Sequence, residues 1–170
     1  MNLRLLPLVP ATALALSGAS FCAHSATTPV VEANSAVLAC QAARSANEGA
    51  LRKRPKAVQN EGTTSVFVSC GLHGNGFNGI SPRTTSVIMS MLNIGPTPVI
   101  VSCTAVDSLT GAGTVTKSAT IAAGLGYSMN FLATDLNSAG YWYSPAFSCV
   151  LPPNAGIKQI WHYFDQEIGA

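Results

Sequence analysis

Alternation of apolar and polar residues over short stretches dominates this sequence from residue 51 onward. In an extended strand over residues 64–70, Val66 and Val68 fall on one face, whereas Phe67 and Ser69 fall on the other. Clusters of Gly, Pro, Asn and Ser separate such stretches, and no long stretch has the 3.6-residue period of an amphipathic helix. The pattern predicts short β-strands joined by turns.

Seven or eight strands are predicted in this way. They are expected at residues 57–59, 64–70, 85–93, 99–105, 114–121, 127–133, 142–151 and 157–164. We expect residues 85–93 and 99–105 to form a hairpin, because the turn sequence Gly95-Pro96-Thr97-Pro98 lies between them. Pro145 should confine its strand to a sheet edge or a bulge. This spacing predicts an all-β fold, an antiparallel β-sandwich, with a barrel as the alternative.

The first 25 residues have the features of a secretory signal peptide. Arg4 precedes an apolar segment, and the small residues Ala23 and Ser25 fit the positions before a cleavage site. The apolar segment is interrupted by proline and is too short for a transmembrane helix. We therefore expect residues 1–25 to be removed, leaving no transmembrane segment and a secreted or periplasmic protein.

The remaining chain divides into two parts that differ in residue composition and in the pattern of apolar residues. Residues 26–50 are weakly patterned and rich in alanine, which predicts an N-terminal lead-in, and residues 51–170 form the predicted sandwich domain. The whole chain is 48% hydrophobic and 9% charged, a composition that favours a buried core over disorder or a coiled coil. With 9 basic and 7 acidic residues, it lacks the charge of a nucleic-acid-binding protein.

Four cysteines remain once Cys22 leaves with the signal peptide: Cys40, Cys70, Cys103 and Cys149. In an exported domain they predict two disulfides, for which three connectivities are possible. We expect Cys40–Cys70, because Cys40 precedes the regular strands and would join the lead-in to the strand that ends at Cys70. We expect Cys103–Cys149 because both lie inside strands with similar flanking residues. No metal-ligand spacing accompanies the cysteines.

Three short motifs resemble those of uncharacterised exported bacterial proteins that form disulfide-bonded β-sandwiches. They are the valine-rich strand ending at Cys70, the sequence Val101-Ser102-Cys103-Thr104, and the sequence Cys149-Val150-Leu151-Pro152 before an aromatic last strand. Gly71 stands where such proteins usually have proline. The resemblance implies a small disulfide-bonded sandwich and implies no activity.

No residue pattern in the chain predicts catalysis, a metal or a cofactor. His73 and His162 are the two histidines after residue 25, and no G-x-S-x-G motif accompanies either of them. His162 should be a partly exposed strand residue that points away from its aromatic neighbours. The glycines of a G-x-G-x-x-G pattern at residues 74–79 lack the strand-loop-helix context of a dinucleotide site. We expect a non-catalytic protein, and a hydrolase is the least favoured alternative.

A basic run and an aromatic cluster are the candidate binding features. The basic run, defined as Arg52, Lys53, Arg54 and Lys56, holds four of the eight Lys and Arg residues that follow Arg4. It would contact an anionic surface or, alternatively, protect a sheet edge from association.

Nine of the 12 aromatic residues lie in the last 44 positions. We expect these aromatic rings to pack in the core and at its rim, and Tyr141, Trp142 and Tyr143 are alternatively a possible platform for a carbohydrate ligand. The sequence thus favours an exported, non-catalytic structural or interaction domain of unknown partner. A carbohydrate-binding module that uses the C-terminal aromatic residues is the alternative. The partner is left unknown, with a cell-envelope glycan and an anionic surface as the candidates.

Overall fold

The computed structural model describes residues 26–72, 83–108, 113–136, 140 and 142–169. Its strands are β1 (Ala26–Ser35), β2 (Cys40–Ala42), β3 (Leu51–Arg54), β4 (Ala57–Asn60), β5 (Val66–Gly71), β6 (Arg83–Asn93), β7 (Val99–Asp107), β8 (Thr114–Ile121), β9 (Gly126–Leu132), β10 (Pro145–Leu151) and β11 (Ala155–Gly169). A four-residue helix α1 (Ala36–Ala39) and two 3-10 turns, Ser45–Asn47 and Ala133–Asp135, are the other regular elements of these ranges.

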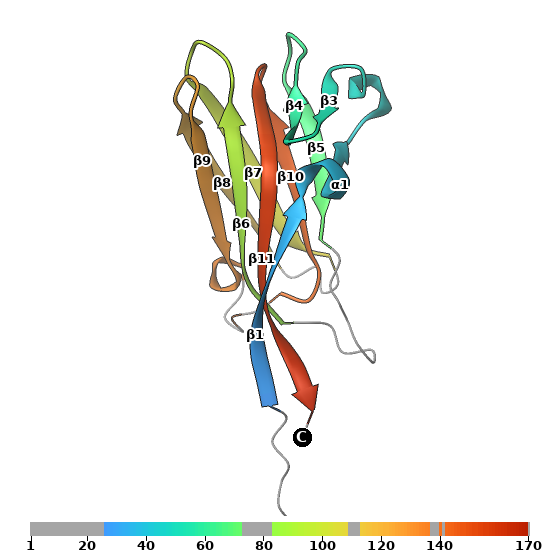
Figure 1. The fold of residues 1–170 in the computed structure, drawn as a ribbon, viewed down its shortest axis with the longest axis vertical. Coiled ribbons are helices and arrows are strands. Elements are labelled where there is room, and N and C mark those ends of the chain that lie inside the picture. The colour runs from blue at the N-terminus through green and yellow to red at the C-terminus, as the bar shows by residue number, and fades with distance from the viewer. Residues whose placement is uncertain (1–25, 73–82, 109–112, 137–139, 141, 170) are drawn as a thin grey trace, which may run out of the picture.

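The strands form two antiparallel sheets, as the alternation of the sequence predicts. The six-stranded sheet has the order β3-β4-β11-β6-β9, and β1 also pairs with β11. The five-stranded sheet has the order β2-β5-β10-β7-β8. Figure 1 shows β11 along the middle of the molecule, with β1 beside its lower part and both strands extending beyond the others. The predicted antiparallel β-sandwich is confirmed, with more strands than the expected seven or eight.

The core lies between the two sheets and consists of the inward-facing residues of alternating positions. Val87, Met89 and Met91 of β6 are fully buried, and so are Val66 and Val68 of β5. Burial of one such side chain stabilises the fold by about 1.5–3 kcal/mol. The other large side chains that are fully buried are Trp142, Phe131, Ile121, Leu151, Ile157, Ile160, His162 and Val58.

The expected hairpin between residues 85–93 and 99–105 does not form. β6 pairs with β9 and β11 in one sheet, whereas β7 pairs with β8 and β10 in the other. The connection between them crosses from sheet to sheet, and Asn93 holds it. The Asn93 Nδ2 group donates hydrogen bonds to the carbonyls of Thr97 at 2.8 Å and Ile121 at 3.1 Å, and its Oδ1 accepts one from Gly95 N.

Pro145 lies in the middle of the five-stranded sheet, which corrects the expectation of an edge or a bulge. It is the first residue of β10, and β10 lies between β5 and β7. A proline at the start of a strand removes no hydrogen bond from the interior of the ladder, and this position is therefore compatible with a central strand.

The N-terminal lead-in is not irregular: residues 26–50 contribute to both sheets. β1 pairs with β11 along its whole length, α1 crosses between the sheets, and β2 pairs with β5. β1 shows no sequence alternation of the usual kind because it is a sheet edge that leaves most of its residues accessible to solvent. The proposed signal peptide lies outside the described residues.

Both predicted disulfides are confirmed, and both join directly paired residues of the five-stranded sheet. Cys40–Cys70 links β2 to β5 with a Cα–Cα distance of 4.1 Å, and Cys103–Cys149 links β7 to β10 with one of 4.0 Å. All four cysteines are buried. Such structural disulfides are typical of proteins of oxidising, extracytoplasmic compartments. No helix in the described part of the chain is long and apolar enough to cross a membrane.

Candidate functional site

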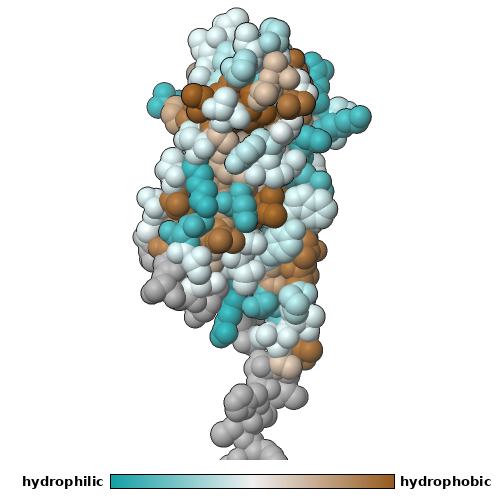
Figure 2. Space-filling view, turned by 90° about the vertical axis from the view of Figure 1, so that its left-hand side faces the viewer, coloured by the Kyte–Doolittle hydropathy of each residue, from teal (hydrophilic) through white to brown (hydrophobic). Residues whose placement is uncertain are grey.

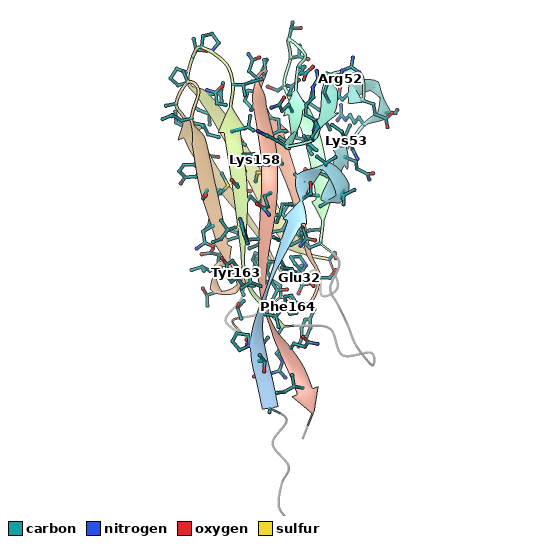
Figure 3. The ribbon with its side chains drawn as sticks, in the orientation of Figure 1. Glu32, Arg52, Lys53, Lys158, Tyr163 and Phe164 are labelled. Carbon is teal, nitrogen blue, oxygen red and sulfur yellow. A yellow bond between two sulfur atoms is a disulfide. The ribbon has the colours of Figure 1, made fainter. Side chains whose placement is uncertain are left out.

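Two aromatic side chains project from the outer face of the six-stranded sheet. Trp161 and Tyr163 lie two residues apart on β11 and therefore share a face, while Ile160 and His162 point into the core. Trp161 is 37% exposed and Tyr163 is half-buried. Two residues of a strand span about 7 Å, so the rings lie side by side along β11. We call these two residues the aromatic pair; Figure 3 labels Tyr163 on this face.

The neighbouring strands extend this aromatic surface. Ala33 of β1 and Ile88 of β6 are the cross-strand partners of Trp161. Val31 of β1 is the partner of Tyr163, and its side chain is 50% exposed. These neighbours have shorter side chains than tryptophan and tyrosine, and the two rings therefore project further from this part of the sheet.

Polar side chains border the aromatic pair on the same face. The next row across the sheet consists of Gln159, Ser90 and Ser128, which are cross-strand partners on β11, β6 and β9. In the row of Trp161 itself, Asn130 of β9 is the cross-strand partner of Ile88, on the side of Ile88 away from Trp161. Amide and hydroxyl groups both donate and accept hydrogen bonds, which suits them to ligands that carry many hydroxyls.

His162 anchors this part of β11 from inside the sandwich. It is fully buried, which corrects the expectation of partial exposure, although it does point away from Trp161 and Tyr163 as expected. Its Nε2 lies 2.6 Å from Thr84 Oγ1, and its ring lies 4.8 Å from that of Phe164. Burial lowers the pKa of His162 to about 4, and the imidazole is therefore neutral at pH 7. His73 and the G-x-G-x-x-G pattern lie outside the described residues.

A hollow of about 550 Å³ lies further along the same face, toward the end of the sandwich opposite the β1–β11 extension. Gln59, Gly156, Leu92 and Gly126 form one row of cross-strand partners across four strands, and Gln59, Leu92 and Gly126 of this row line the hollow. Gly126 is exposed and carries no side chain beside Leu92. The remaining lining residues are Lys56, Asn93, Ile94, Gly124, Leu125 and Lys158. We call this the cationic hollow, after its two lysines.

Apolar side chains form one rim of the cationic hollow. Ile94 is 55% exposed and Leu125 is 60% exposed, in the β6–β7 and β8–β9 connections respectively. Figure 2 views the molecule from the left-hand side of Figure 1 and shows apolar atoms gathered near this end. The hollow therefore combines apolar, amide and cationic groups.

The basic run lies on the edge strand β3 and the turn that follows it, and all four of its side chains are exposed. The structure separates these cations from one another. The Arg54 guanidinium donates two hydrogen bonds of 2.7 Å to the Glu61 carboxylate; this contact lowers the pKa of Glu61 and raises that of Arg54. Lys53 lies beside Glu48 in a different hollow, of about 310 Å³. Lys56 alone lines the cationic hollow.

Lys158 is the functional candidate that sequence reasoning missed. It is an isolated basic residue in an otherwise apolar and aromatic segment, so no local pattern connects it with the basic run. The structure brings it to the same hollow as Lys56, because β4 pairs with β11 at residues 156–157. Figure 3 shows Lys158 on β11 with Arg52 and Lys53 on the neighbouring hairpin.

Of the two interpretations of Tyr141, Trp142 and Tyr143, core packing applies to the central residue. Trp142 is fully buried, its Nε1 donates a hydrogen bond of 3.3 Å to Ala133 O, and its ring packs 6.0 Å from Phe147. A ring enclosed in the core cannot stack on a ligand. Tyr143 is half-buried, and Tyr141 lies outside the described residues.

Two carboxylates, those of Asp107 and Asp135, serve structural contacts. Asp107 is buried and accepts hydrogen bonds from the backbone N–H groups of Tyr143 and Ser144. Asp135 lies 2.6 Å from Lys117 Nζ. Burial raises the pKa of Asp135, but the hydrogen bonds from Lys117 and Leu132 N have a larger combined effect, and the pKa is lowered overall. No group of three His, Cys, Asp or Glu residues that could hold a metal ion occurs in the described ranges.

No protein-family model matches the sequence, and no curated protein matches it. Among solved structures, TmCBM61 in complex with β-1,4-galactotriose is similar with a TM-score of 0.37 and 5% identity over 81% of this chain and 88% of that chain. A structure described as CBM4 gives a TM-score of 0.34 and 10% identity over 80% and 86% of the two chains.

An exo-β-1,3-galactanase from Phanerochaete chrysosporium, solved with galactose, gives a TM-score of 0.36 and 16% identity over 82% of this chain. The match spans 30% of the galactanase chain. TM-scores of this size are too low to carry a conclusion about function.

Proposed function

We propose that this chain is an exported, non-catalytic module that binds carbohydrate on the outer face of its six-stranded sheet. Trp161 and Tyr163 form the stacking platform, in place of the buried Trp142. Gln159, Asn130 and the serine hydroxyls of the adjacent strands supply hydrogen bonds to the sugar hydroxyls.

The observation that carries this proposal is the aromatic pair itself. Two accessible rings stand on one strand in the interior of a sheet, where most accessible positions carry small or polar side chains. Sugar rings present C–H groups on their faces and hydroxyls around their rims. An aromatic face bordered by amides and hydroxyls therefore complements both parts of a sugar.

The rigidity of β11 supports the same interpretation. Strand β11 is paired on both sides, with β6 along one edge and with β4 and β1 along the other. The buried contacts of His162 with Thr84 and Phe164 hold the segment from the inside. Little ordering of the backbone is then needed when a ligand binds, which favours affinity.

Trp161→Ala tests this proposal, with Phe67→Ala as the matched control. Phe67 is 45% exposed on the outer face of the five-stranded sheet, so its removal changes a similar surface on the opposite side. The purified wild-type protein is first screened against a panel of neutral and acidic polysaccharides. We expect Trp161→Ala to weaken binding to the retained polysaccharides by about tenfold or more, and Phe67→Ala to leave it unchanged.

Two outcomes would contradict the proposal. One is that the wild-type protein retains none of the polysaccharides. The other is that Trp161→Ala and Phe67→Ala bind equally well, while circular dichroism shows that both variants are folded.

A further inference from the structure

We infer that the carbohydrate ligand is acidic, and that the cationic hollow binds a carboxylate or sulfate group on one of its sugars. This inference rests on the proposed function and adds a substrate class to it. Lys56 and Lys158 supply the charge, Gln59 supplies an amide, and Leu92 forms the apolar floor.

The glycines on the two sides of Leu92 differ in their surroundings. Gly156 and Gly126 are the cross-strand partners of Leu92 on either side of it. A Cβ atom added to Gly156 would lie 2.7 Å from Val58 O and 2.9 Å from Gln59 Cγ, and one added to Gly126 would lie 3.1 Å from Met91 O. Atoms of β4 therefore already fill the space at Gly156, which is buried, whereas Gly126 is exposed and lines the hollow beside Leu92.

The two lysines reach the hollow from different parts of the fold. Lys56 lies in the turn between β3 and β4, and Lys158 lies at the irregularity of β11 where its register with β6 shifts. Both side chains are exposed, and no acidic residue is among the residues that line the hollow. The salt bridges found in the described ranges are Arg54–Glu61 and Lys117–Asp135, and they use neither lysine.

The cationic hollow and the aromatic pair belong to one continuous surface. Leu92 in the hollow and Ile88 beside Trp161 are four residues apart on β6, a separation of about 13 Å along the strand. The row of Gln159, Ser90 and Ser128 lies between them. An oligosaccharide of several units can therefore stack on Trp161 while a charged unit occupies the hollow.

Charge complementarity favours an acidic polysaccharide over a neutral one. A lysine ammonium donates charge-assisted hydrogen bonds to carboxylate and sulfate oxygens. Because both lysines are exposed, their attraction for the ligand must weaken as added salt screens it. A neutral ligand would gain nothing from the two charges and would show no such dependence on salt.

The test is the double variant Lys56→Gln/Lys158→Gln, measured with polygalacturonate, a sulfated galactan and a neutral galactan. The matched control is Arg44→Gln/Lys53→Gln, which removes the same charge from two exposed residues outside the hollow. We expect the hollow variant to lose about tenfold in affinity for an acidic polysaccharide at low salt. Raising the salt to about 0.5 M should produce a similar loss in the wild-type protein.

The results separate this inference from the proposed function. The comparison of polygalacturonate with the sulfated galactan shows which anionic group is preferred. If the wild-type protein binds the neutral galactan as tightly as either acidic polymer and only Trp161→Ala reduces binding, the inference is wrong and the proposed function holds. If no polysaccharide binds but vesicles containing phosphatidylglycerol bind through the two lysines, both are wrong.

Discussion

The outer faces of the two sheets differ although their inner faces are alike. Both sheets contribute aliphatic, aromatic and sulfur-containing side chains to the common core. On the five-stranded sheet, one outer row consists of Gln41, Ser69, Ser148, Thr104 and Thr116 from five adjacent strands. On the six-stranded sheet, the corresponding face carries the aromatic pair, the amides and the cationic hollow.

Hydrogen bonding and side-chain length distinguish the two outer faces. On the five-stranded sheet, Thr104 Oγ1 and Thr116 Oγ1 lie 2.8 Å apart, and Ser118 Oγ donates to Ser102 Oγ at 2.9 Å. These hydroxyls already satisfy one another, and their side chains are too short to project far from the sheet. Long amide, lysine and aromatic side chains on the other face project toward solvent. This difference is the reason for placing the proposed carbohydrate site on the six-stranded sheet.

The largest expected effect concerns the five-stranded sheet, which contains both disulfides. In the chain-entropy model, each link stabilises the fold by about 3.5–4 kcal/mol, because it closes a long loop in the unfolded chain. Removing both with Cys40→Ala/Cys70→Ala/Cys103→Ala/Cys149→Ala should consume most of a typical ~5–15 kcal/mol of stability. Calorimetry of this variant, and of the wild-type protein with and without reductant, measures the loss as a fall in Tm.

Hydrogen exchange on single-pair variants sharpens the comparison between the sheets. Removing Cys103 and Cys149 should raise exchange first in β7 and β10, because the link joins these two strands. Equal increases in the exchange rates of β6 and β11 would show that the disulfide does not stabilise the five-stranded sheet more than the six-stranded sheet.

The next largest expected effect is a difference in stability between variants of the two tryptophans, one buried and one exposed. Trp142→Ala should destabilise the protein by about 3–5 kcal/mol, because it leaves a cavity among Phe131, Phe147 and their neighbours and removes the hydrogen bond to the Ala133 carbonyl. Trp161→Ala, on the outer face, should cost about 1 kcal/mol or less. Urea unfolding measures both values. Equal losses for the two variants would contradict the assignment of one ring to the core and the other to the surface.

The third effect is a pH dependence that arises in the six-stranded sheet. The pKa of His162 is about 4 in the folded protein and about 6.5 in the unfolded chain. The unfolded state therefore binds more protons between these values. The stability that the neutral imidazole provides is complete above pH 6.5 and is lost as the pH falls to 4. The loss is about 3 kcal/mol at 1.36 kcal/mol per pH unit.

Urea unfolding at several pH values between 7 and 4 measures this dependence. His162→Gln is the comparison, because it keeps a polar group opposite Thr84 but does not titrate. Glu32, the cross-strand neighbour of His162 on β1, is present in both proteins. A wild-type profile parallel to that of His162→Gln would exclude the histidine as the cause.

Much of the local structure was predictable, because alternation determines which residues share a face. Val66 and Val68, and likewise Val87, Met89 and Met91, lie together in the core as expected. The disulfide pairs were also predicted correctly. Cys103 and Cys149 have similar flanking residues within strands, and Cys40 precedes the regular strands. The false hairpin between β6 and β7 shows the limit: a turn sequence gives the place where the chain reverses but not the sheet that the next strand joins.

The sequence by itself predicted most strands of the domain, their alternating faces, the presence of two disulfides and the sandwich class. These properties depend on residues close in the chain or on chemistry that has few alternatives. Only the tertiary structure decided that Trp142 lies inside and Trp161 outside, and that Lys158 joins Lys56 beside Leu92. Alternation assigns two residues to the same or to opposite faces, but the pairing of distant strands decides which face is covered and which side chains become neighbours.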